Sequence, residues 1–535
     1  MYVATVPNRT SPPAILLRES YREGGRTKTR TLANLSHWDP ARIEALRRAL
    51  RGDFDHLPWG DPTCGAVFGV LFVLKQVAEE LGIVRALGQA EWARLALFLI
   101  LARVAHQGSR LSAVRWAADQ AVREILGTAD FDENDLYRTL DELAQRQETI
   151  EKRLYDRRVQ RRGGQPPVLV LYDVTSSYLE GHCHELGAFG YNRDGKKGKL
   201  QIVVGLLTDE QGEPLAVRVF QGNQGDPTTV GTQVDILKQE FGIQEVVFVG
   251  DRGMVKSLGK EALKEADLRY ITALTDPQIR KLLKEGTLQM GLFEEKICEV
   301  QAGDLRYVLR KNPDMERKEW HRVADKLAKL ARRVETRNAF VAGSQRAEPE
   351  SGLKQQQEWV RRHRLQSFVR VSLQGRSLVV EIDETAQSNA LLLAGCYVIE
   401  TDVSAERLAA QQVHDRYKDL AKVERDWRSF KTGMLEIRPL FLRKANRTQA
   451  HALVCMLALK IVREMEGRLK ACFGTTDTDP HAITVPDALA ALSRLCLQHY
   501  RLENGTLITR LPQPDPRQQT ILEALQINLP SRPNL

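Results

Sequence analysis

The sequence predicts a mixed α/β fold, in which an antiparallel meander is continued by crossover units in one sheet. The element order from 167 to 274 is strand, strand, strand, helix, strand, helix, strand. Two of these strands, VLVLYDV (168–174) and EVVFVGD (245–251), are almost wholly apolar, as strands buried on both faces are. Each carries an aspartate at its end, where a sheet opens into a crevice. This order is the one that a ribonuclease-H-like core requires.

The composition is that of an ordinary globular protein. Hydrophobic residues make up 42% and charged residues 27% of the 535, which excludes a disordered, collagenous or fibrous chain. The net charge of +9 favours a polyanionic partner such as nucleic acid over an acidic one, and a basic protein without such a partner is the alternative. Seven cysteines without a CxxC pair predict neither a disulfide framework nor a zinc ribbon, and indicate the cytoplasm. The longest apolar runs are too short to span a bilayer, so we expect no membrane partner.

The N-terminal segment, 1–61, is predicted to form a basic hairpin and a helix. The hairpin covers 14–33 and turns at two successive glycines. Its Arg and Lys side chains leave two interpretations open, a solvated sheet face and a surface that contacts DNA. The segment 38–52 predicts a helix with Asp39 as its cap and Pro40 at its first position.

An all-helical domain is expected next, from 62 to 163. Two apolar core helices come first, and Asp132 and Asn134 can cap a long amphipathic helix that runs from about 134 to 161. A basic linker closes the domain. The first part of the α/β core then occupies 167–274.

Residues 275–405 interrupt this core and are predicted to be a β-rich insertion. Antiparallel strands are expected at 289–312 and 366–384, with a loop or weak helix at 339–359. The charged helix 315–337 is either a solvated face or a DNA contact. The remaining segments are a helix that completes the core (406–472) and a C-terminal tail (473–535).

The two strand-end aspartates, Asp173 and Asp251, are candidate metal ligands. They belong to the first and fourth strands of the predicted sheet, which are neighbours in a ribonuclease-H-like order. Their carboxylates could therefore share a divalent metal; Mg²⁺ takes oxygen ligands, typically one or two carboxylates and substrate phosphates. For either aspartate alone, a turn or helix-capping role is the alternative.

A third element is the predicted helix 413–432, in which Tyr417, Glu424 and Lys431 are spaced by seven. Seven residues make nearly two full turns, so the three side chains line one helix face. This face is either partly solvated or turned toward a metal site. In the second case Glu424 completes the carboxylate set, and Tyr417 and Lys431 can hydrogen-bond phosphate.

These residues resemble the YREK signature, Y-x2-R-x3-E-x6-K, of the DDE transposases of bacterial insertion sequences. The chain reads Tyr417-x2-Leu420-x3-Glu424-x6-Lys431, so a leucine replaces the signature arginine. Lys418, Arg425 and Arg428 are candidates to replace its phosphate contact. Further segments that carry the resemblance are YDVTSSYLEG (172–181), GYNRDGKKGKLQ (190–201), FQGNQGDPTT (220–229) and FVGDRGM (248–254).

The resemblance implies an enzyme whose catalytic, metal-binding triad is Asp173, Asp251 and Glu424. Mg²⁺ is the implied cofactor, with Mn²⁺ as a substitute, and two-metal chemistry is the implied mechanism. The implied reaction is cleavage at the ends of the element, followed by transfer of the 3′-hydroxyl into target DNA. The implied partners are double-stranded DNA, as terminal inverted repeats and target, and a second copy of the chain in a homodimer. We expect the helical domain, 62–163, to bind the terminal inverted repeats. A bacterial cytoplasmic protein bound to the nucleoid fits this activity.

Several cationic residues could contact the DNA backbone. They are Arg193, Lys196, Lys197 and Lys199 in a glycine-containing turn, Arg252 after the second aspartate, and Arg428 beside Lys431. Asp226 is expected to cap a helix. Because Leu420 departs from the signature, a catalytically inactive, domesticated DNA-binding descendant is the alternative function. A cellular nuclease without strand transfer is a third.

Overall fold

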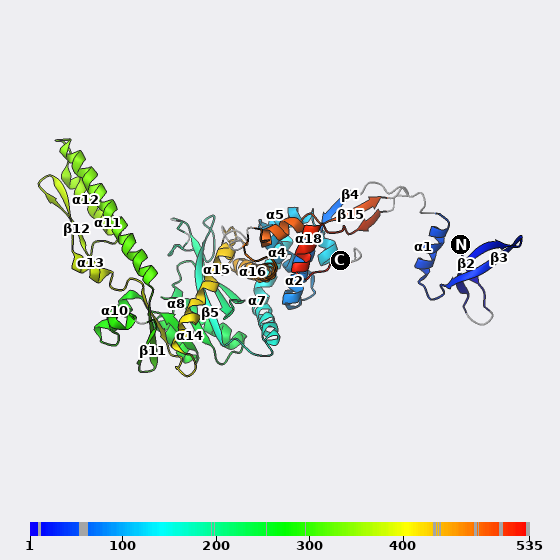
Figure 1. The fold of residues 1–535 in the computed structure, drawn as a ribbon, viewed down its shortest axis with the longest axis horizontal. Coiled ribbons are helices and arrows are strands. Elements are labelled where there is room, and N and C mark those ends of the chain that lie inside the picture. Colours follow the sequence, from blue (N-terminus) through cyan, green and yellow to red (C-terminus); the bar gives the residue numbers. More distant parts are fainter. Residues whose placement is uncertain are drawn as a thin grey trace. The chain divides into compact units, whose positions relative to one another are not determined.

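The computed structural model, drawn in Figure 1, describes most of the chain. The chain divides into two compact units. The described residues are 1–8, 12–52, 63–193, 195–196, 198–252, 254–294, 296–431, 435, 437, 440–475, 479, 481–501 and 507–530. The first unit comprises Met1–Gln76, Val114–Asp130 and Met465–Leu535, and the second comprises Val77–Ala113 and Phe131–Glu464. Among the described helices, none is long and apolar enough to cross a membrane.

The second unit is built on a mixed sheet whose core is ribonuclease-H-like, as the sequence predicts. Its core strands are β5 (Leu169–Tyr178), β6 (Gln201–Asp209), β7 (Pro214–Gln221), β8 (Val247–Gly250) and β9 (Arg269–Ala273). β5, β6 and β7 form an antiparallel meander. β8 pairs with β5 in parallel, and β9 with β8. The strand order is therefore β7-β6-β5-β8-β9.

β5 is longer than the sequence predicts. The apolar pattern breaks at Thr175, yet the strand continues through Tyr178 because β6 pairs with it along this whole stretch. Its small polar side chains are buried between neighbouring elements. Asp173 is consequently in the interior of β5 and not at its end. The parallel pairing with β8, in contrast, stops at Tyr172 and Gly250, one residue before Asp173.

Helices cover this sheet and share its core. α8 (Asp226–Asp235) and α9 (Ser257–Glu265) form the crossovers. α7 (Glu133–Arg161) packs against β7, and Asp132 and Asp135 form a capping box at its start, as Asp132 was predicted to do. Tyr155 of α7 stacks on Phe241, with ring centroids 4.4 Å apart. α3 (Ile83–Leu87) and α4 (Glu91–Ala105) pack against α7.

The interrupting segment, 275–405, contributes strands to the main sheet and a helical pair beyond it. β10 (Cys298–Ala302), β11 (Leu305–Lys311) and β14 (Cys396–Thr401) extend the sheet in the order β10-β11-β14-β9. The other elements are α10 (Asp276–Lys284), α11 (Pro313–Ala342), α12 (Pro349–Arg362), β12 (Val369–Gln374), β13 (Ser377–Ile382) and α13 (Glu384–Ala390). α12 lies in the stretch expected to be a loop or weak helix. It forms because Pro349 opens it and Val360 packs into an apolar cluster with α11.

The first unit contains the predicted N-terminal hairpin. Its strands are β2 (Ala14–Glu23) and β3 (Arg26–Asn34), and the turn between them places Gly24 and Gly25 at φ 59° and 75°. β1 (Tyr2–Val6) adds a third strand that the sequence did not indicate. α1 (Pro40–Leu50) follows, and the Asp39 carboxylate accepts a hydrogen bond from the Ala41 amide, as predicted.

The expectation that 62–163 is helical throughout is wrong at its beginning. β4 (Thr63–Val67) is a strand and pairs with β15 (Cys496–Arg501). Its partner is more than 400 residues away in the sequence, so no local pattern could reveal the pairing. Further elements of the chain are α2 (Gly69–Leu81), α5 (Arg110–Ala117), α6 (Val122–Leu126), α16 (Ala445–Phe473), α17 (Val485–Leu492), β16 (Leu507–Arg510) and α18 (Pro516–Ala524).

Gly222, directly after β7, is expected to tolerate no side chain. A Cβ atom there would clash with the backbone carbonyl oxygens of Gln201 and Ala188, which cannot rotate away. We expect Gly222→Ala to lower the free energy of unfolding by about 2 kcal/mol or more. Gly231→Ala is the control, because its Cβ has open space inside α8 and alanine should stabilise that helix by about 1 kcal/mol. Urea denaturation of both variants measures the difference; equal stabilities would contradict it.

Candidate active site

Strand pairing places Asp173 and Asp251 side by side. The last parallel pair between β5 and β8 is Tyr172 with Gly250, so the next residue on each chain is an aspartate. β8 ends there while β5 continues, which leaves an opening in the sheet at this position. Asp173 is half-buried in β5, and Asp251 is exposed. The prediction that the two strands are neighbours is confirmed, and each aspartate directly follows the last parallel pair.

The pKa of Asp173 reflects the burial of this carboxyl group and the charges around it. Burial, and then the negative charges of Asp251 and Glu424, raise the pKa of Asp173 to about 7. A hydrogen bond from the Val174 amide, 2.8 Å away, and the positive charge of Arg193 act in the opposite direction. Three carboxylates and one guanidinium therefore act on one another at this opening, and the carboxylates repel.

Glu424 comes from a helix that packs against β5. The single helix expected at 413–432 is two helices, α14 (Ala410–Lys418) and α15 (Leu420–Lys431), separated at Asp419. The buried side of α15 is formed by Leu420, Val423, Asp426, Trp427 and Phe430. Glu424 lies on the exposed side, whereas Tyr417 and Lys431 are half-buried. The three residues spaced by seven are thus not a buried stripe.

Tyr417 joins α14 to the second aspartate. Its hydroxyl donates a hydrogen bond to Oδ1 of Asp251 at 3.1 Å, and the Arg252 amide donates to the same oxygen at 2.6 Å. Burial, followed by the charge of Asp251, raises the pKa of Tyr417. The phenol therefore stays protonated at neutral pH and holds one oxygen of Asp251 in place.

The position of α14 depends on strands that the interrupting segment adds to the sheet. His414 is buried, and its ring contacts Nη1 of Arg310 on β11 at 2.9 Å and the hydroxyl of Tyr397 on β14. Burial lowers the pKa of His414, so the ring is neutral at pH 7. Sequence reasoning missed this trio, because three elements far apart in the chain supply it. It fixes the helix that presents Tyr417.

Arg193 is in the site but already has a partner. Its Nη2 lies 2.7 and 2.6 Å from the two carboxylate oxygens of Asp226, and its backbone amide donates to the Ser176 hydroxyl at 2.9 Å. Asp226 was expected to cap α8, but Gly225 is the N-cap and Asp226 lies in the first turn. The Asp-Pro dipeptide correctly predicted a helix start. It gave no indication that the aspartate pairs with Arg193.

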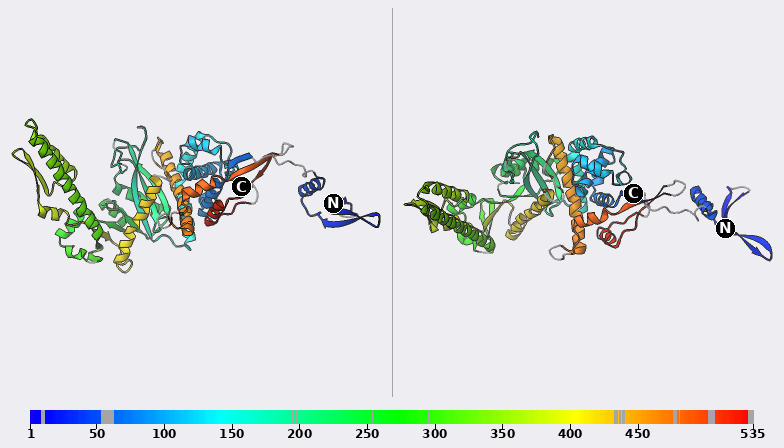
Figure 2. Two further views of the ribbon diagram at one scale, coloured as in Figure 1. Left: turned by 45° about the horizontal axis from the view of Figure 1, so that its top comes forward. Right: turned by 90° about the horizontal axis from the view of Figure 1, so that it is seen from above.

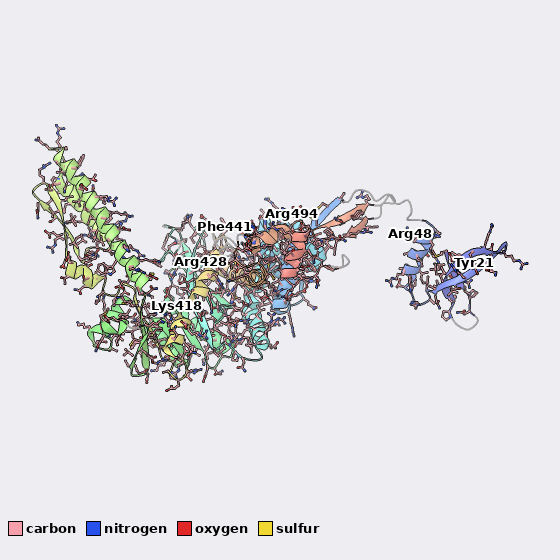
Figure 3. The ribbon with its side chains drawn as sticks, in the orientation of Figure 1. Tyr21, Arg48, Lys418, Arg428, Phe441 and Arg494 are labelled. Carbon is pink, nitrogen blue, oxygen red and sulfur yellow. The ribbon has the colours of Figure 1, made fainter. Side chains whose placement is uncertain are left out.

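The other predicted phosphate contacts differ in their surroundings. Lys199 pairs with Glu180 at 2.8 Å, and Nζ of Lys196 lies 5.9 Å from the Tyr178 ring centroid. Arg252 is exposed and its guanidinium is 3.9 Å from Asp276. Arg428 is exposed on α15, where Figure 3 labels it. Lys197 lies outside the described residues.

The donor chemistry at the opening suits a divalent cation. Carboxylate oxygens are the ligands that Mg²⁺ and related ions prefer, and a cation would relieve the repulsion that raises the pKa of Asp173. Within the described residues, no three Asp, Glu, His or Cys side chains are close enough together to hold an ion unaided. Mg²⁺ sites for phosphoryl transfer typically use one or two carboxylates together with substrate phosphates. The Asp173–Asp251 pair meets that requirement.

The fold and site define a class: a ribonuclease-H-like sheet with carboxylates at the opening between β5 and β8. Residues 164–461 match the family model of the transposase DDE domain, which covers more than half of the chain. Residues 3–58 match the IS1634 family transposase, N-terminal domain. The chain belongs to the DDE transposases of insertion sequences. It is therefore a DNA-binding enzyme that cuts DNA and transfers a strand, and it requires a divalent metal.

Two solved transposase complexes show weak structural similarity to the chain. The piggyBac transposase synaptic complex with hairpin DNA is 11% identical, with a TM-score of 0.34, over 75% of this chain and 69% of that one. The Mos1 transposase paired-end complex with left transposon end is 10% identical, with a TM-score of 0.15, over 34% and 58%. The family assignment rests on the sequence models. No match was found among curated proteins.

Proposed function

We propose that Asp173, Asp251 and Glu424 are the catalytic carboxylates of this transposase and that Mg²⁺ is the metal they hold. The observation that carries the proposal is the position of Asp173 and Asp251 directly after the last parallel pair of β5 and β8, with the helix of Glu424 packed against β5. Burial, and then the negative charges of Asp251 and Glu424, raise the pKa of Asp173 at this position. Uncompensated carboxylates that crowd together are costly unless a cation or a function requires them. Mn²⁺, which also prefers oxygen ligands, is expected to substitute.

The protein residues would have separate roles around the DNA. Asp173 and Asp251 would hold metal from neighbouring strands, and Glu424 would complete the set from α15. Bound metal would supply an activated water or 3′-hydroxyl and charge stabilisation of the leaving 3′-oxygen. Tyr417 would fix the orientation of Asp251 through the 3.1 Å hydrogen bond. Catalysis would then depend on positioning the scissile phosphate in line with the attacking oxygen.

Cationic side chains around the opening would hold the DNA backbone. Lys431 and Arg428 on α15, Arg252 after β8, and Lys196 and Lys199 of the glycine-containing turn are the proposed contacts. Lys197 belongs to the same turn in the sequence. Arg193 would contribute only if DNA phosphate displaces Asp226, because that carboxylate now occupies the guanidinium.

Leu420 is compatible with this role for the helix. It is buried at the start of α15, so its side chain belongs to the packing of the helix and not to the DNA-facing side. Arg428 is exposed eight residues later and is our candidate for the phosphate contact that the YREK signature assigns to arginine. The active form would be a homodimer that brings two inverted-repeat ends together at the nucleoid.

The test is cleavage of a labelled duplex that carries the DNA flanking this gene. We expect Mg²⁺-dependent nicking at the element end, reduced about 10²-fold or more by Glu424→Gln, which removes a charge from the exposed side of α15 without disturbing its buried side. Glu464→Gln is a matched control outside the site. Nicking by Glu424→Gln at the wild-type rate would refute the assignment of Glu424.

A further inference from the structure

α11 carries two sets of cations on adjacent faces. The first set holds the helical pair together. Nζ of Lys326 donates to the His363 carbonyl at 3.2 Å, Nε of Arg333 to Gln356 Oε1 at 2.9 Å, and Nη2 of Arg337 to the Glu348 carbonyl at 2.9 Å. This side of α11 faces α12, which lies beside it in each view (Figure 2). These cations are accounted for by the fold.

The second set has no such role. It consists of Lys318, Arg322, Lys329 and Arg332, which are all exposed and which we name the basic stripe. At 100° per residue the four positions fall within an arc of about 80°, on the side away from the buried Val334. At 1.5 Å per residue they extend along about 21 Å of the helix. The stripe is therefore a straight row of charge on one face.

The cations of the stripe make no direct contact with an acidic side chain of the described residues. In the part of the chain that the structure describes, none of the four side chains forms an ion pair or a side-chain hydrogen bond. Arg317, by contrast, pairs with Asp314 on the same helix. The helical pair and its hairpin, residues 313–382, contain 15 Lys and Arg against nine Asp and Glu, an excess of six out of the chain's nine.

Such an arrangement weakens the helix that carries it. Lys318 and Arg322 are four residues apart, and Lys329 and Arg332 are three apart, so like charges are neighbours on the helix surface. Each such pair costs about 0.2–0.5 kcal/mol, whereas alternating charges would stabilise the helix by a similar amount. A solvated face selected only for helix stability would carry more acidic partners than the one Asp325 that lies within the stripe.

We propose that the basic stripe binds the phosphate backbone of duplex DNA. A row of about 21 Å matches about six base pairs at 3.4 Å each. Flexible cations without a carboxylate partner suit phosphate contacts, which position a duplex and read no sequence. The inference rests on the DNA-binding activity of the family and is independent of which residues form the catalytic triad.

The experiment compares the wild type with the full-length variant Lys318→Gln/Arg322→Gln/Lys329→Gln/Arg332→Gln. Binding to a labelled element-end duplex and to an unrelated duplex is measured between about 50 and 200 mM salt. If all four side chains contact phosphates, the slope of the logarithm of the binding constant against the logarithm of the salt concentration should become shallower by about 3.6 in the variant. Across this range of salt, the affinity of the wild type should therefore fall by about 100-fold more than that of the variant. Unchanged affinity and salt dependence on both duplexes would overturn the proposal.

Two controls test whether the loss of affinity depends on the charges of the stripe or on the loss of any four positive charges. Lys264→Gln/Lys281→Gln/Lys284→Gln/Arg317→Gln removes the same number of charges from positions outside the stripe, and an equal loss of affinity in this variant would refute a role specific to the stripe. The swap Lys318→Arg/Arg322→Lys/Lys329→Arg/Arg332→Lys keeps the charge and should keep the affinity. A swap variant as weak as the glutamine variant would overturn a backbone contact made by charge alone.

The reaction steps distinguish the two DNA sources. If the stripe holds element DNA, Mg²⁺-dependent nicking of the end should fall with affinity in the glutamine variant. If it holds target DNA, nicking should be unchanged, and only transfer of a pre-cut end into a plasmid should fall. Both steps at wild-type rates would refute a role for the stripe, while Glu424→Gln would still test the catalytic site separately.

Discussion

Replacing Asp173 by asparagine is expected to lower metal-dependent DNA cleavage by about 10³-fold or more. Asp173 is the carboxylate that both Asp251 and Glu424 influence, and it lies where β8 ends and β5 continues. Asparagine keeps the size of the side chain but removes the charge that would hold the metal. The effect should therefore appear in the cleavage rate, measured on a labelled duplex at saturating Mg²⁺, and not in DNA affinity.

The same substitution is expected to stabilise the metal-free protein. Burial and the neighbouring carboxylates raise the pKa of Asp173 from 3.8 to about 7, so the ionised form is disfavoured in the folded state. Below pH 3.8 the residue is protonated in both states and imposes no penalty. As the pH rises toward 7 the unfolded chain ionises first, and the folded state loses relative stability. At pH 8 the asparagine variant should be more stable by about 1–3 kcal/mol.

Urea denaturation in EDTA at pH 8 and pH 4.5 measures this stabilisation. The advantage of Asp173→Asn should be present at pH 8 and largely absent at pH 4.5. Asp235→Asn on α8, outside the carboxylate group, is the control and should show no such dependence. A variant that loses both cleavage and stability would mean that Asp173 serves packing, and the metal assignment would then be withdrawn. Opposite signs for activity and stability are typical of functional residues.

The core of the fold was predictable because its signals are local. The apolar runs of β5 and β8, the turn with Gly212 at φ 80°, and the Asp-Pro start of α8 each occupy fewer than a dozen residues. The length of β5 was not predictable in this way. Thr175–Tyr178 stay in the strand only because β6 supplies the pairing partners. The pairing of β4 with β15 was not predictable either, because the two strands are far apart in the sequence.

The candidate site likewise contains residues that have a local sequence signal and residues that have none. Asp173 and Asp251 are marked by the strands that precede them, and Glu424 by its spacing from Tyr417, so all three could be proposed from the sequence. Their neighbours were not. The ion pair between Arg193 and Asp226 joins a loop to a helix 33 residues later. Likewise, His414 finds its partners on two strands of the segment that interrupts the core. Such contacts exist only in the folded protein.

Arg218→Met is expected to destabilise the protein strongly, by about 3–5 kcal/mol. Arg218 of β7 pairs with Glu151 of α7 and with Glu240 after α8, with contacts of 2.6 Å to both. Glu151 is fully buried, and its Oε1 also accepts hydrogen bonds from Gln147 and the Val217 amide. Methionine preserves the apolar stem but leaves the Glu151 carboxylate without its cation.

The pH dependence separates this cause from simple loss of packing. Burial already raises the pKa of Glu151 above its ordinary value of 4.5, and removal of the guanidinium should raise it further. A raised folded-state pKa favours the folded protein at low pH, and this advantage is lost as the pH rises through that pKa. The deficit of Arg218→Met should therefore be small near pH 4.5 and full at pH 8. A lost packing contact would give the same deficit at both.

The double variant Glu151→Gln/Arg218→Met decides between these causes. Glutamine is neutral, and its side-chain oxygen can still accept from the Val217 amide, so the double variant should recover most of the stability that Arg218→Met loses. Thermal and urea unfolding at pH 8 give the coupling free energy between the two positions. If the double variant were as unstable as Arg218→Met, the arginine would act through its contact with Glu240 instead, and Glu240→Gln alone would then reproduce the loss.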